Sequence, residues 1–235
     1  MRKVTIVMLV AVLLLPSGFL FAGGRPNKDY KDWFGHFGGG WSMIQGDASD
    51  ILDDEWYFNG GATYWPSDWP IGIDLDLSWS NYEFSREAIN AINTAIDSDP
   101  IGALGGDVTG GDVDIWGFTL NGQWSPMKNE GGAGFYITAG VGGYYLDGRL
   151  TDTGLVYYPP YCDPWYWWCV PGGYGQGDYI VASEASTKFG YNAGVGLTFE
   201  VGSGGQLVIE ARYHTIDTYQ GTSTDFVPLT IGYRW

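Results

Sequence analysis

Apolar and polar residues alternate at every second position over many short stretches of this chain. The clearest stretch is 71–80, whose apolar positions are Ile71, Ile73, Leu75, Leu77 and Trp79. Glycine, aspartate and serine occupy the positions between them. Successive side chains of a β-strand point to opposite faces, so this period of two predicts a strand with one apolar and one polar face.

Seven other stretches show the same alternation. The predicted strands lie at 33–44, 56–65, 71–80, 112–124, 135–146, 188–200, 207–214 and 225–235. The connections between them alternate between long and short, as in a barrel with short turns at one end and long loops at the other. The longest connection is 147–186, and the connection after 80 contains Ser85 followed by isoleucines at helical spacing. We therefore expect an all-β, eight-stranded antiparallel barrel with long external loops, and a short capped helix in one of them.

The distribution of side chains between the two faces favours a membrane barrel over a soluble ligand-carrying barrel. The apolar faces are rich in Trp, Phe and Tyr, which would overfill the narrow interior of eight strands. The polar faces are rich in Gly, Thr, Ser and Asn and carry charges of both signs. Such faces suit an interior in which buried charges are paired. We expect a transmembrane barrel whose apolar faces contact lipid.

The stretch 225–235 supports this prediction. Its apolar positions include Leu229, Ile231, Tyr233 and Trp235, and it ends on an aromatic residue. In a closed barrel the last strand pairs with the first, and aromatic residues gather at the lipid–water interface. Arg234 is expected to face inward, close to Glu200 or Glu210.

The first 22 residues have the pattern of a signal peptide. Arg2 and Lys3 precede a mainly apolar run at 4–15, and Ala22 is a plausible cleavage residue. The run is shorter than the roughly 20 residues of a spanning helix. We expect residues 1–22 to be removed on export and 23–235 to form the barrel domain.

The charge of the chain excludes one class of partner. The formal net charge is −16, and it becomes −18 when Arg2 and Lys3 are removed with the signal peptide. Binding to nucleic acid needs basic residues that neutralise phosphates, so no nucleic-acid partner is expected. Docking on an anionic surface would need bridging divalent cations.

The second half of the chain resembles a known family. The stretches STKFGYNAGVGLTFEVGSGGQLVIEARYHTID and TDFVPLTIGYRW are similar to the OmpA/OmpX-like, opacity-type outer-membrane β-barrel proteins of Gram-negative bacteria. The resemblance implies an eight-stranded barrel in the outer membrane, in contact with lipid and lipopolysaccharide. It also implies that the barrel-assembly machinery recognises Leu229, Ile231, Tyr233 and Trp235. No peptidoglycan-binding domain is expected.

The polar faces predict a cluster of charges inside the barrel. Its members are Asp74, Asp76, Lys188, Glu200, Glu210, Arg212 and Arg234. One interpretation is a set of ion pairs that controls a narrow pore. The other is a packed polar interior that conducts nothing, which the small lumen of eight strands favours.

The connection 147–186 contains the most unusual stretch. Cys162 and Cys169 are the two cysteines, and an oxidising compartment favours a disulfide between them over free thiols or a metal pair. The candidate binding residues are Tyr161, Trp165, Tyr166, Trp167 and Trp168. Exposed aromatic clusters often mark a binding surface, although this loop could instead pack on itself.

Other candidate sites are weaker. His214 could belong to a lipid A esterase, but no serine stands two residues after it. The acidic run 47–55 could bind Ca²⁺ or simply be solvated, and 105–114 faintly resembles a single Gly/Asp calcium repeat. We expect no catalytic residue and no cofactor. The expected function is a non-enzymatic surface protein that is structural or adhesive, with a narrow channel as the alternative.

Overall fold

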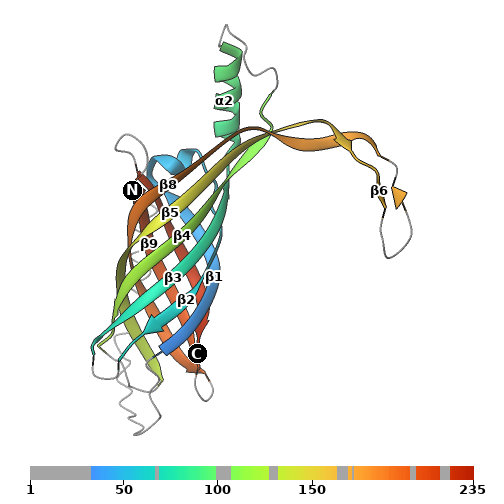
Figure 1. Cartoon of the computed structure of the whole chain (residues 1–235). Helices are drawn as coiled ribbons and strands as arrows, with labels where there is room; N and C mark the ends of the chain where they lie inside the picture. Colours follow the sequence, from blue (N-terminus) through green and yellow to red (C-terminus); the bar gives the residue numbers. More distant parts are fainter. Residues whose placement is uncertain are drawn as a thin grey trace.

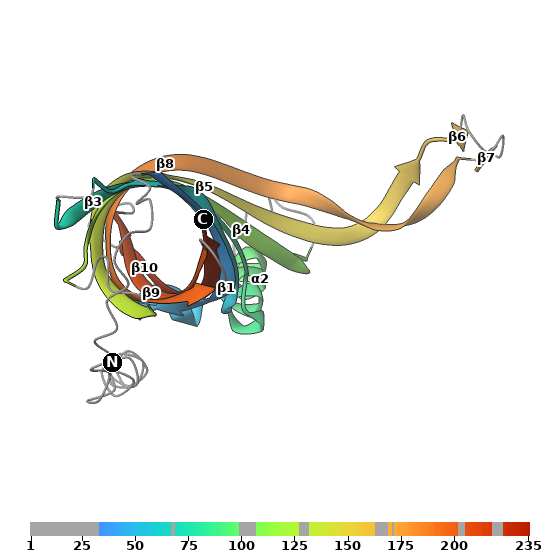
Figure 2. The same cartoon turned by 90° about the horizontal axis from the view of Figure 1, so that it is seen from below.

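Eight antiparallel strands close into a barrel, as the sequence predicts (Figures 1 and 2). The computed structural model describes residues 33–66, 69–98, 107–126, 132–162, 169–170, 172–201, 205–217 and 223–235. The barrel strands are β1 Trp33–Gln45, β2 Glu55–Tyr64, β3 Ile71–Glu83, β4 Gly110–Trp124, β5 Ala133–Tyr158, β8 Gly173–Val201, β9 Gly205–Asp217 and β10 Ser223–Arg234. The expected signal peptide, 1–22, lies outside the described residues and stays a prediction.

The first and last strands close the ring. β1 pairs with β10 in one continuous register, from His36 opposite Arg234 to Gln45 opposite Asp225. Beyond this register, the Trp235 N–H donates to the Gly35 carbonyl at 3.0 Å. Closure leaves no strand of the ring with an unpaired edge at membrane depth, where exposed backbone groups would be costly.

The two ends of the barrel differ. β2 and β3, β4 and β5, and β8 and β9 come within a few residues of each other along the chain at one end of the barrel, called the turn end here. The other end, the loop end, carries the 3-10 helix η1 Gly46–Asp50, the helix α2 Arg86–Ser98 and the tops of β5 and β8 (Figure 1). The predicted cap of α2 is confirmed, because Ser85 Oγ accepts a hydrogen bond from the Ala88 N–H at 3.2 Å. None of the described helices has the length and apolar character needed to cross a membrane.

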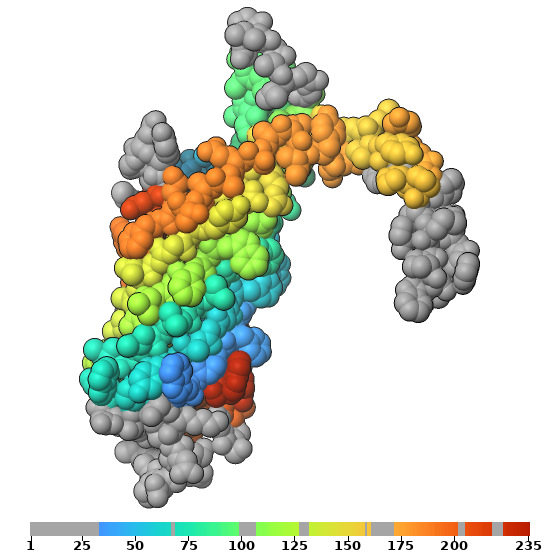
Figure 3. Space-filling view, in the orientation of Figure 1, coloured from blue at the N-terminus to red at the C-terminus, as the bar shows by residue number. Residues whose placement is uncertain are grey.

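The longest connection is mostly strand, so its prediction as loop throughout 147–186 is wrong. β5 continues to Tyr158 and β8 begins at Gly173, and the two pair from Asp147 opposite Ala185 to Tyr158 opposite Gly173. The resulting ribbon projects far from the barrel (Figures 1 and 3). Both strands extend beyond the barrel because their backbones pair with each other. A local pattern of residues does not reveal such pairing.

The outward surface of the barrel is apolar and is bordered by two groups of aromatic side chains. At the loop end, ring contacts connect Trp41, Trp56, Phe58, Trp79 and Trp116 in a row across β1 to β4. At the turn end, they connect Trp33 with Tyr64, and Trp235 with Phe37 and Tyr233. Aromatic girdles on both sides of an apolar band are typical of a membrane-spanning barrel.

The height of this band fits a membrane. In β4, the exposed residues Trp116 and Trp124 enclose Phe118 and Leu120, which are also exposed. At about 3.3 Å per residue, the strand from Trp116 to Trp124 is roughly 26 Å long, or about 20 Å along the axis at the tilt usual in barrels. This approaches the ~25 Å apolar band of outer-membrane barrels. The barrel is a transmembrane barrel with its apolar faces outward.

The final strand has the predicted orientation. Leu229, Ile231, Tyr233 and Trp235 are exposed on the outward surface, whereas Arg234 is buried inside the barrel. Their part in assembly stays a prediction.

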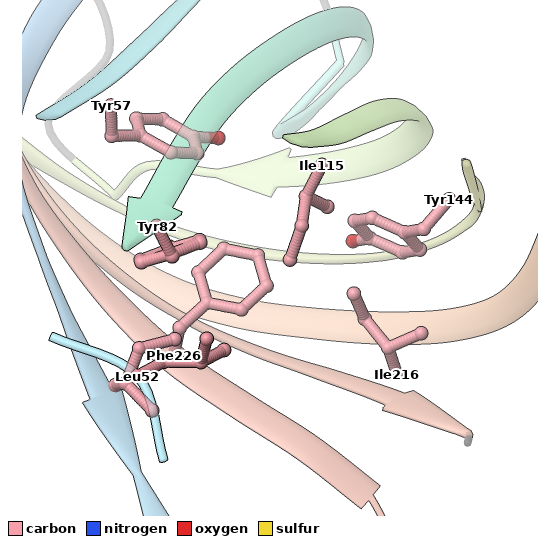
Figure 4. Close-up of a cluster of buried hydrophobic side chains, with 8 residues drawn as sticks. Leu52, Tyr57, Tyr82, Ile115, Tyr144, Ile216 and Phe226 are labelled. Atoms are coloured by element: carbon pink, nitrogen blue, oxygen red, sulfur yellow. The ribbon is translucent and has the colours of Figure 1, made fainter. Parts of the chain in front are cut away.

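Large side chains fill the interior at both ends. The cluster toward the loop end contains Ile44, Leu52, Tyr57, Tyr82, Ile115, Tyr144, Ile216 and Phe226, seven of them labelled in Figure 4. The cluster toward the turn end contains Trp65, Tyr136 and Val208. The sequence prediction assigned aromatic residues to the outward face and missed these inward rings. The alternation along the strands could have predicted them. Tyr57, for example, stands between the outward residues Trp56 and Phe58 and must therefore face inward.

Candidate functional site

A layer of buried charges lies between the two apolar clusters of the interior. Asp74 and Asp76 come from β3, Glu210 and Arg212 from β9, and Arg234 from β10, and all five are buried. Successive side chains of a strand point to opposite faces. These side chains therefore face the interior, because the residues before and after them in the sequence face lipid.

Arg212 holds two of these carboxylates. Its Nη1 lies 2.8 Å from Asp76 Oδ2, and its Nη2 lies 2.7 Å from Glu210 Oε1. The Arg212 side chain is 4% exposed and the Asp76 side chain 1%, so the pair is almost free of solvent screening. A charge removed from such a pair leaves its partner buried and uncompensated.

Arg234 is held by a different set of groups. Its Nη2 donates to Gln123 Oε1 at 3.0 Å, and its guanidinium lies 5.2 Å from the centre of the Tyr136 ring. The Tyr136 hydroxyl in turn donates to Glu210 Oε2 at 2.5 Å. Arg234 is therefore linked to Glu210 through an aromatic ring, and not to Glu200.

His36 joins the charged layer, and the sequence prediction missed it. Its Nδ1 lies 3.6 Å from Asp74 Oδ1 and its Nε2 lies 3.5 Å from Asp76 Oδ1. The imidazole reaches β3 across β2, where Gly61 stands in register between His36 and Asp76. A Cβ at Gly61 would come within 2.9 Å of the imidazole Cε1. The alternation along β1 could have predicted this position, because Phe37 faces outward and the residue before it must then face inward.

Two predicted members of the cluster lie elsewhere. Glu200 is exposed, opposite Gln206 near the end of β8, because an inward position at the end of a strand lies at the rim of the barrel. Lys188 is half-buried opposite Tyr144, toward the loop end. The structure therefore brings together five of the seven predicted residues and adds His36.

The interior has little free space. A cavity of about 20 Å³ lies beside the charged layer, lined in part by His36, Asn59, Arg212 and Arg234. This is close to the volume that a single water molecule requires. Ion pairs and aromatic rings occupy the middle of the barrel, so this part of the chain is a packed interior.

His214 lies in the aromatic cluster toward the loop end. Its ring stacks on Phe226 with centroids 4.7 Å apart, and its Nδ1 lies 2.9 Å from the Tyr144 hydroxyl. Among the hydrogen bonds of the described residues, none joins His214 to a serine.

The second candidate site is the projecting hairpin, defined as Asp152 to Tyr158 of β5 with Gly173 to Phe189 of β8. The pairing of β4 with β5 ends at Thr151, and the pairing of β8 with β9 ends at Gly190. Beyond these points each strand has one edge without a neighbouring strand among the described residues (Figures 1 and 2). Its exposed large hydrophobic side chains are Leu155, Tyr157, Tyr174, Tyr179, Ile180 and Phe189.

Polar contacts order the base of the hairpin. The Tyr179 hydroxyl donates to Asp152 Oδ2 at 2.8 Å, and Thr153 Oγ1 donates to Asp178 Oδ1 at 2.7 Å. The hydrogen bond to Asp152 raises the pKa of Tyr179. Further along, the rings of Tyr157 and Tyr174 lie with centroids 5.4 Å apart. These cross-strand contacts stabilise a ribbon that has no core of its own.

Two short strands, β6 and β7, lie on either side of the predicted aromatic site in the sequence. β6 Tyr161–Cys162 pairs with β7 Cys169–Val170, which places Cys162 opposite Cys169. Opposed residues of an antiparallel pair have Cα atoms about 4.5–5.5 Å apart, within the range that a disulfide spans. The disulfide stays a prediction. Trp165, Tyr166, Trp167 and Trp168 lie outside the described residues, as does the Tyr161 side chain.

Comparisons with known proteins give similarity at the level of solved structures. No protein-family model and no curated protein matches the chain. The chain is similar to Ail, the attachment invasion locus protein of Yersinia pestis, with 12% identity, a TM-score of 0.46 and coverage of 87% of this chain and 100% of that chain. It is similar to a major outer membrane protein from Thermus thermophilus, with 10% identity, a TM-score of 0.44 and coverage of 86% and 98%. It is also similar to the N-terminal β-barrel domain of Pseudomonas aeruginosa OprF, with 13% identity, a TM-score of 0.38 and coverage of 87% and 98%.

Proposed function

We propose that this chain is a non-enzymatic outer-membrane protein whose barrel carries the projecting hairpin as a binding surface outside the cell. The observation that carries the proposal is the unpaired edge of each hairpin strand together with exposed apolar side chains. Leu155 and Tyr174 are each 77% exposed, far more than a side chain that packs on its own fold. Exposed apolar groups beside free backbone donors and acceptors are a usual basis of protein recognition.

The chemistry of the hairpin indicates the class of partner. A free strand edge binds an extended polypeptide segment by adding it as a further strand, and neighbouring side chains provide specificity. The partner is therefore a polypeptide with an extended, partly apolar segment. A strongly acidic partner is disfavoured by the net charge of −16.

The barrel serves as the anchor. Its apolar belt and aromatic girdles support contact with outer-membrane lipid and lipopolysaccharide. Leu229, Ile231, Tyr233 and Trp235 are exposed along one face of β10, where the barrel-assembly machinery would recognise them. Replacement of Tyr233 and Trp235 by serine should lower the amount of protein in the outer-membrane fraction, as measured by immunoblotting. Unchanged levels would contradict this role.

Adhesion of cells that display the protein tests the binding function. The variant Leu155→Lys, Tyr174→Lys, Ile180→Lys places charges on the exposed apolar positions of the hairpin without touching the barrel. Adhesion to an extracellular-matrix preparation or to cultured cells should fall at least about tenfold, because a few apolar residues carry most interface energy. Ile51→Lys is the matched control, since Ile51 is exposed at the loop end but lies outside the hairpin.

A second variant locates the binding surface within the hairpin. If the aromatic tip makes the contact, then Trp165→Ala, Trp167→Ala, Trp168→Ala should reduce adhesion more than the strand variant does. Equal adhesion by wild type and both variants, at equal surface levels, would overturn the proposed function.

A further inference from the structure

His36, Asp74 and Asp76 form a group of metal-ligating side chains that the binding surface does not use. One ligand atom from each can be chosen so that all three lie within 4.8 Å of one another. We propose that these residues bind one divalent transition-metal ion, of the class of Zn²⁺, inside the turn-end half of the barrel. This inference concerns the barrel interior and does not depend on the proposed function of the hairpin.

The separations fit coordination better than direct hydrogen bonding. The nitrogen–oxygen distances of 3.5 and 3.6 Å between His36 and the two carboxylates exceed the usual range of about 2.7–3.2 Å. Two ligands at about 2.0–2.1 Å from a tetrahedral Zn²⁺ are roughly 3.3 Å apart. An ion on one imidazole nitrogen therefore lies close to one carboxylate, and the other carboxylate, which faces the second ring nitrogen, has to turn toward it.

Neighbouring polar groups hold both carboxylates in place. Thr63 Oγ1 donates to Asp74 Oδ1 at 2.7 Å, and Asn121 Nδ2 donates to Asp74 Oδ2 at 3.2 Å. Asn59 Nδ2 lies 3.3 Å from Asp76 Oδ2. Such hydrogen bonds orient the ligands of metal sites, and their loss typically weakens metal binding.

Two further atoms beside the group are buried without a hydrogen-bond partner. They are His36 Nδ1 and Asn59 Oδ1, and both residues line the cavity of about 20 Å³. Buried polar atoms are normally satisfied, so orphaned atoms beside a polar cavity indicate a missing ion or water. The cavity has room for the water that completes the coordination of a site with three protein ligands.

The charge of the layer also favours a cation. The buried carboxylates Asp74, Asp76 and Glu210 face the guanidinium groups of Arg212 and Arg234. Arg212 binds Asp76 through Oδ2 and Glu210 through Oε1, so it leaves Asp76 Oδ1 directed to His36. Among the ion pairs of the described residues, Asp74 has none with an arginine or lysine. An ion between Asp74 and Asp76 supplies the positive charge that buried carboxylates require.

The ligand types select the ion. Imidazole suits Zn²⁺, Cu²⁺, Ni²⁺ and Fe²⁺, whereas Ca²⁺ and Mg²⁺ prefer a shell of oxygen atoms. Zn²⁺ is therefore the probe of choice, and Co²⁺ is its spectroscopic substitute.

The test is zinc retention by the full-length barrel. The protein is refolded in detergent with Zn²⁺, free metal is removed by dialysis, and bound zinc is measured by atomic emission. Wild type should retain about one zinc ion per chain, because the three ligands form a single site. Refolding with Co²⁺ should give the visible absorption of low-coordinate cobalt.

Two conservative variants keep the test independent of folding. His36→Gln and Asp74→Asn should reduce metal affinity at least about tenfold while heat-modifiable gel mobility shows that the barrel still folds. Asp112→Asn with Asp114→Asn is the control, because these carboxylates bind Asn81 at the loop-end rim, outside the proposed site. The proposal is overturned if wild type retains no metal. It is also overturned if the control loses metal as much as His36→Gln does, or if His36→Gln retains it fully.

Discussion

β5 and β8 each pass through two environments, the wall of the barrel and the projecting hairpin, and their behaviour differs between them. Inside the wall, burial alternates: Tyr136 is buried and Ile137 exposed on β5, and Asn192 is buried and Tyr191 exposed on β8. In the hairpin, the β8 residues 182–185 are all exposed. The backbone is extended in both regions, yet only the barrel has an inside.

This difference shows that alternation alone does not define a strand's role. In the barrel, a neighbour on each side completes the backbone hydrogen bonds, and the two faces meet lipid and a packed interior. In the hairpin, each strand has one neighbour, and nearly all described side chains are exposed or half-buried on both faces. The barrel wall therefore provides stability, and the hairpin provides surface.

The largest expected effect comes from a break in the charged layer. Arg212→Met should destabilise the barrel by about 3–5 kcal/mol, because it leaves Asp76 and Glu210 buried without their common partner. Urea-induced unfolding in lipid vesicles, followed by tryptophan fluorescence, measures this change. Arg149→Ala, which removes a pair with Asp147 at the loop-end rim, should have little effect. Equal destabilisation by both variants would mean that the interior pair has no special role.

A smaller effect is expected from a charge on the lipid face. Leu120 is exposed midway between Trp116 and Trp124 and pairs with Leu75 and Val141. Leu120→Arg should cost about 2–4 kcal/mol, the value for a basic residue at the membrane midplane.

Leu155→Arg is the matched change in the hairpin. It should leave the free energy of unfolding of the barrel unchanged in the same assay, because Leu155 faces water. A comparable loss of stability in Leu155→Arg would contradict the assignment of the two environments.

No stepwise ion conductance is expected in planar bilayers. The aromatic clusters and the charged layer occupy the interior of the described barrel. A variant that lacks residues 154–177, which joins the opposed residues Thr153 and Asp178, should also show no conductance, since the barrel's own side chains fill the lumen. Current steps in wild type would restore the channel interpretation. Steps in the truncated variant alone would assign the blocking role to the hairpin.

The smallest expected effect follows reduction of the cysteines. Intact mass measurement without reductant should show Cys162 and Cys169 joined, and alkylation should label them only after reduction. Reduction should leave heat-modifiable mobility unchanged, because the tip lies far from the barrel (Figure 1). Two free thiols in the exported protein would contradict the disulfide.

The sequence by itself determined the number of barrel strands, the face of each strand that meets lipid, and the helix capped by Ser85. These features depend on local period and local capping, which a single stretch of residues contains. The alternation of positions along the strands was also enough to place five charged residues inside the barrel: Asp74, Asp76, Glu210, Arg212 and Arg234.

Only the tertiary structure decided which side chains meet. His36 reaches Asp76 because β1, β2 and β3 pair in a register that places Gly61 between them. Arg212 pairs with Asp76, which lies across the ring on another strand and 136 positions earlier in the chain. Closure of the barrel creates these contacts, and closure depends on pairing between distant strands. The same nonlocal pairing extends β5 and β8 into the hairpin, where no hydrophobic contrast marks a strand.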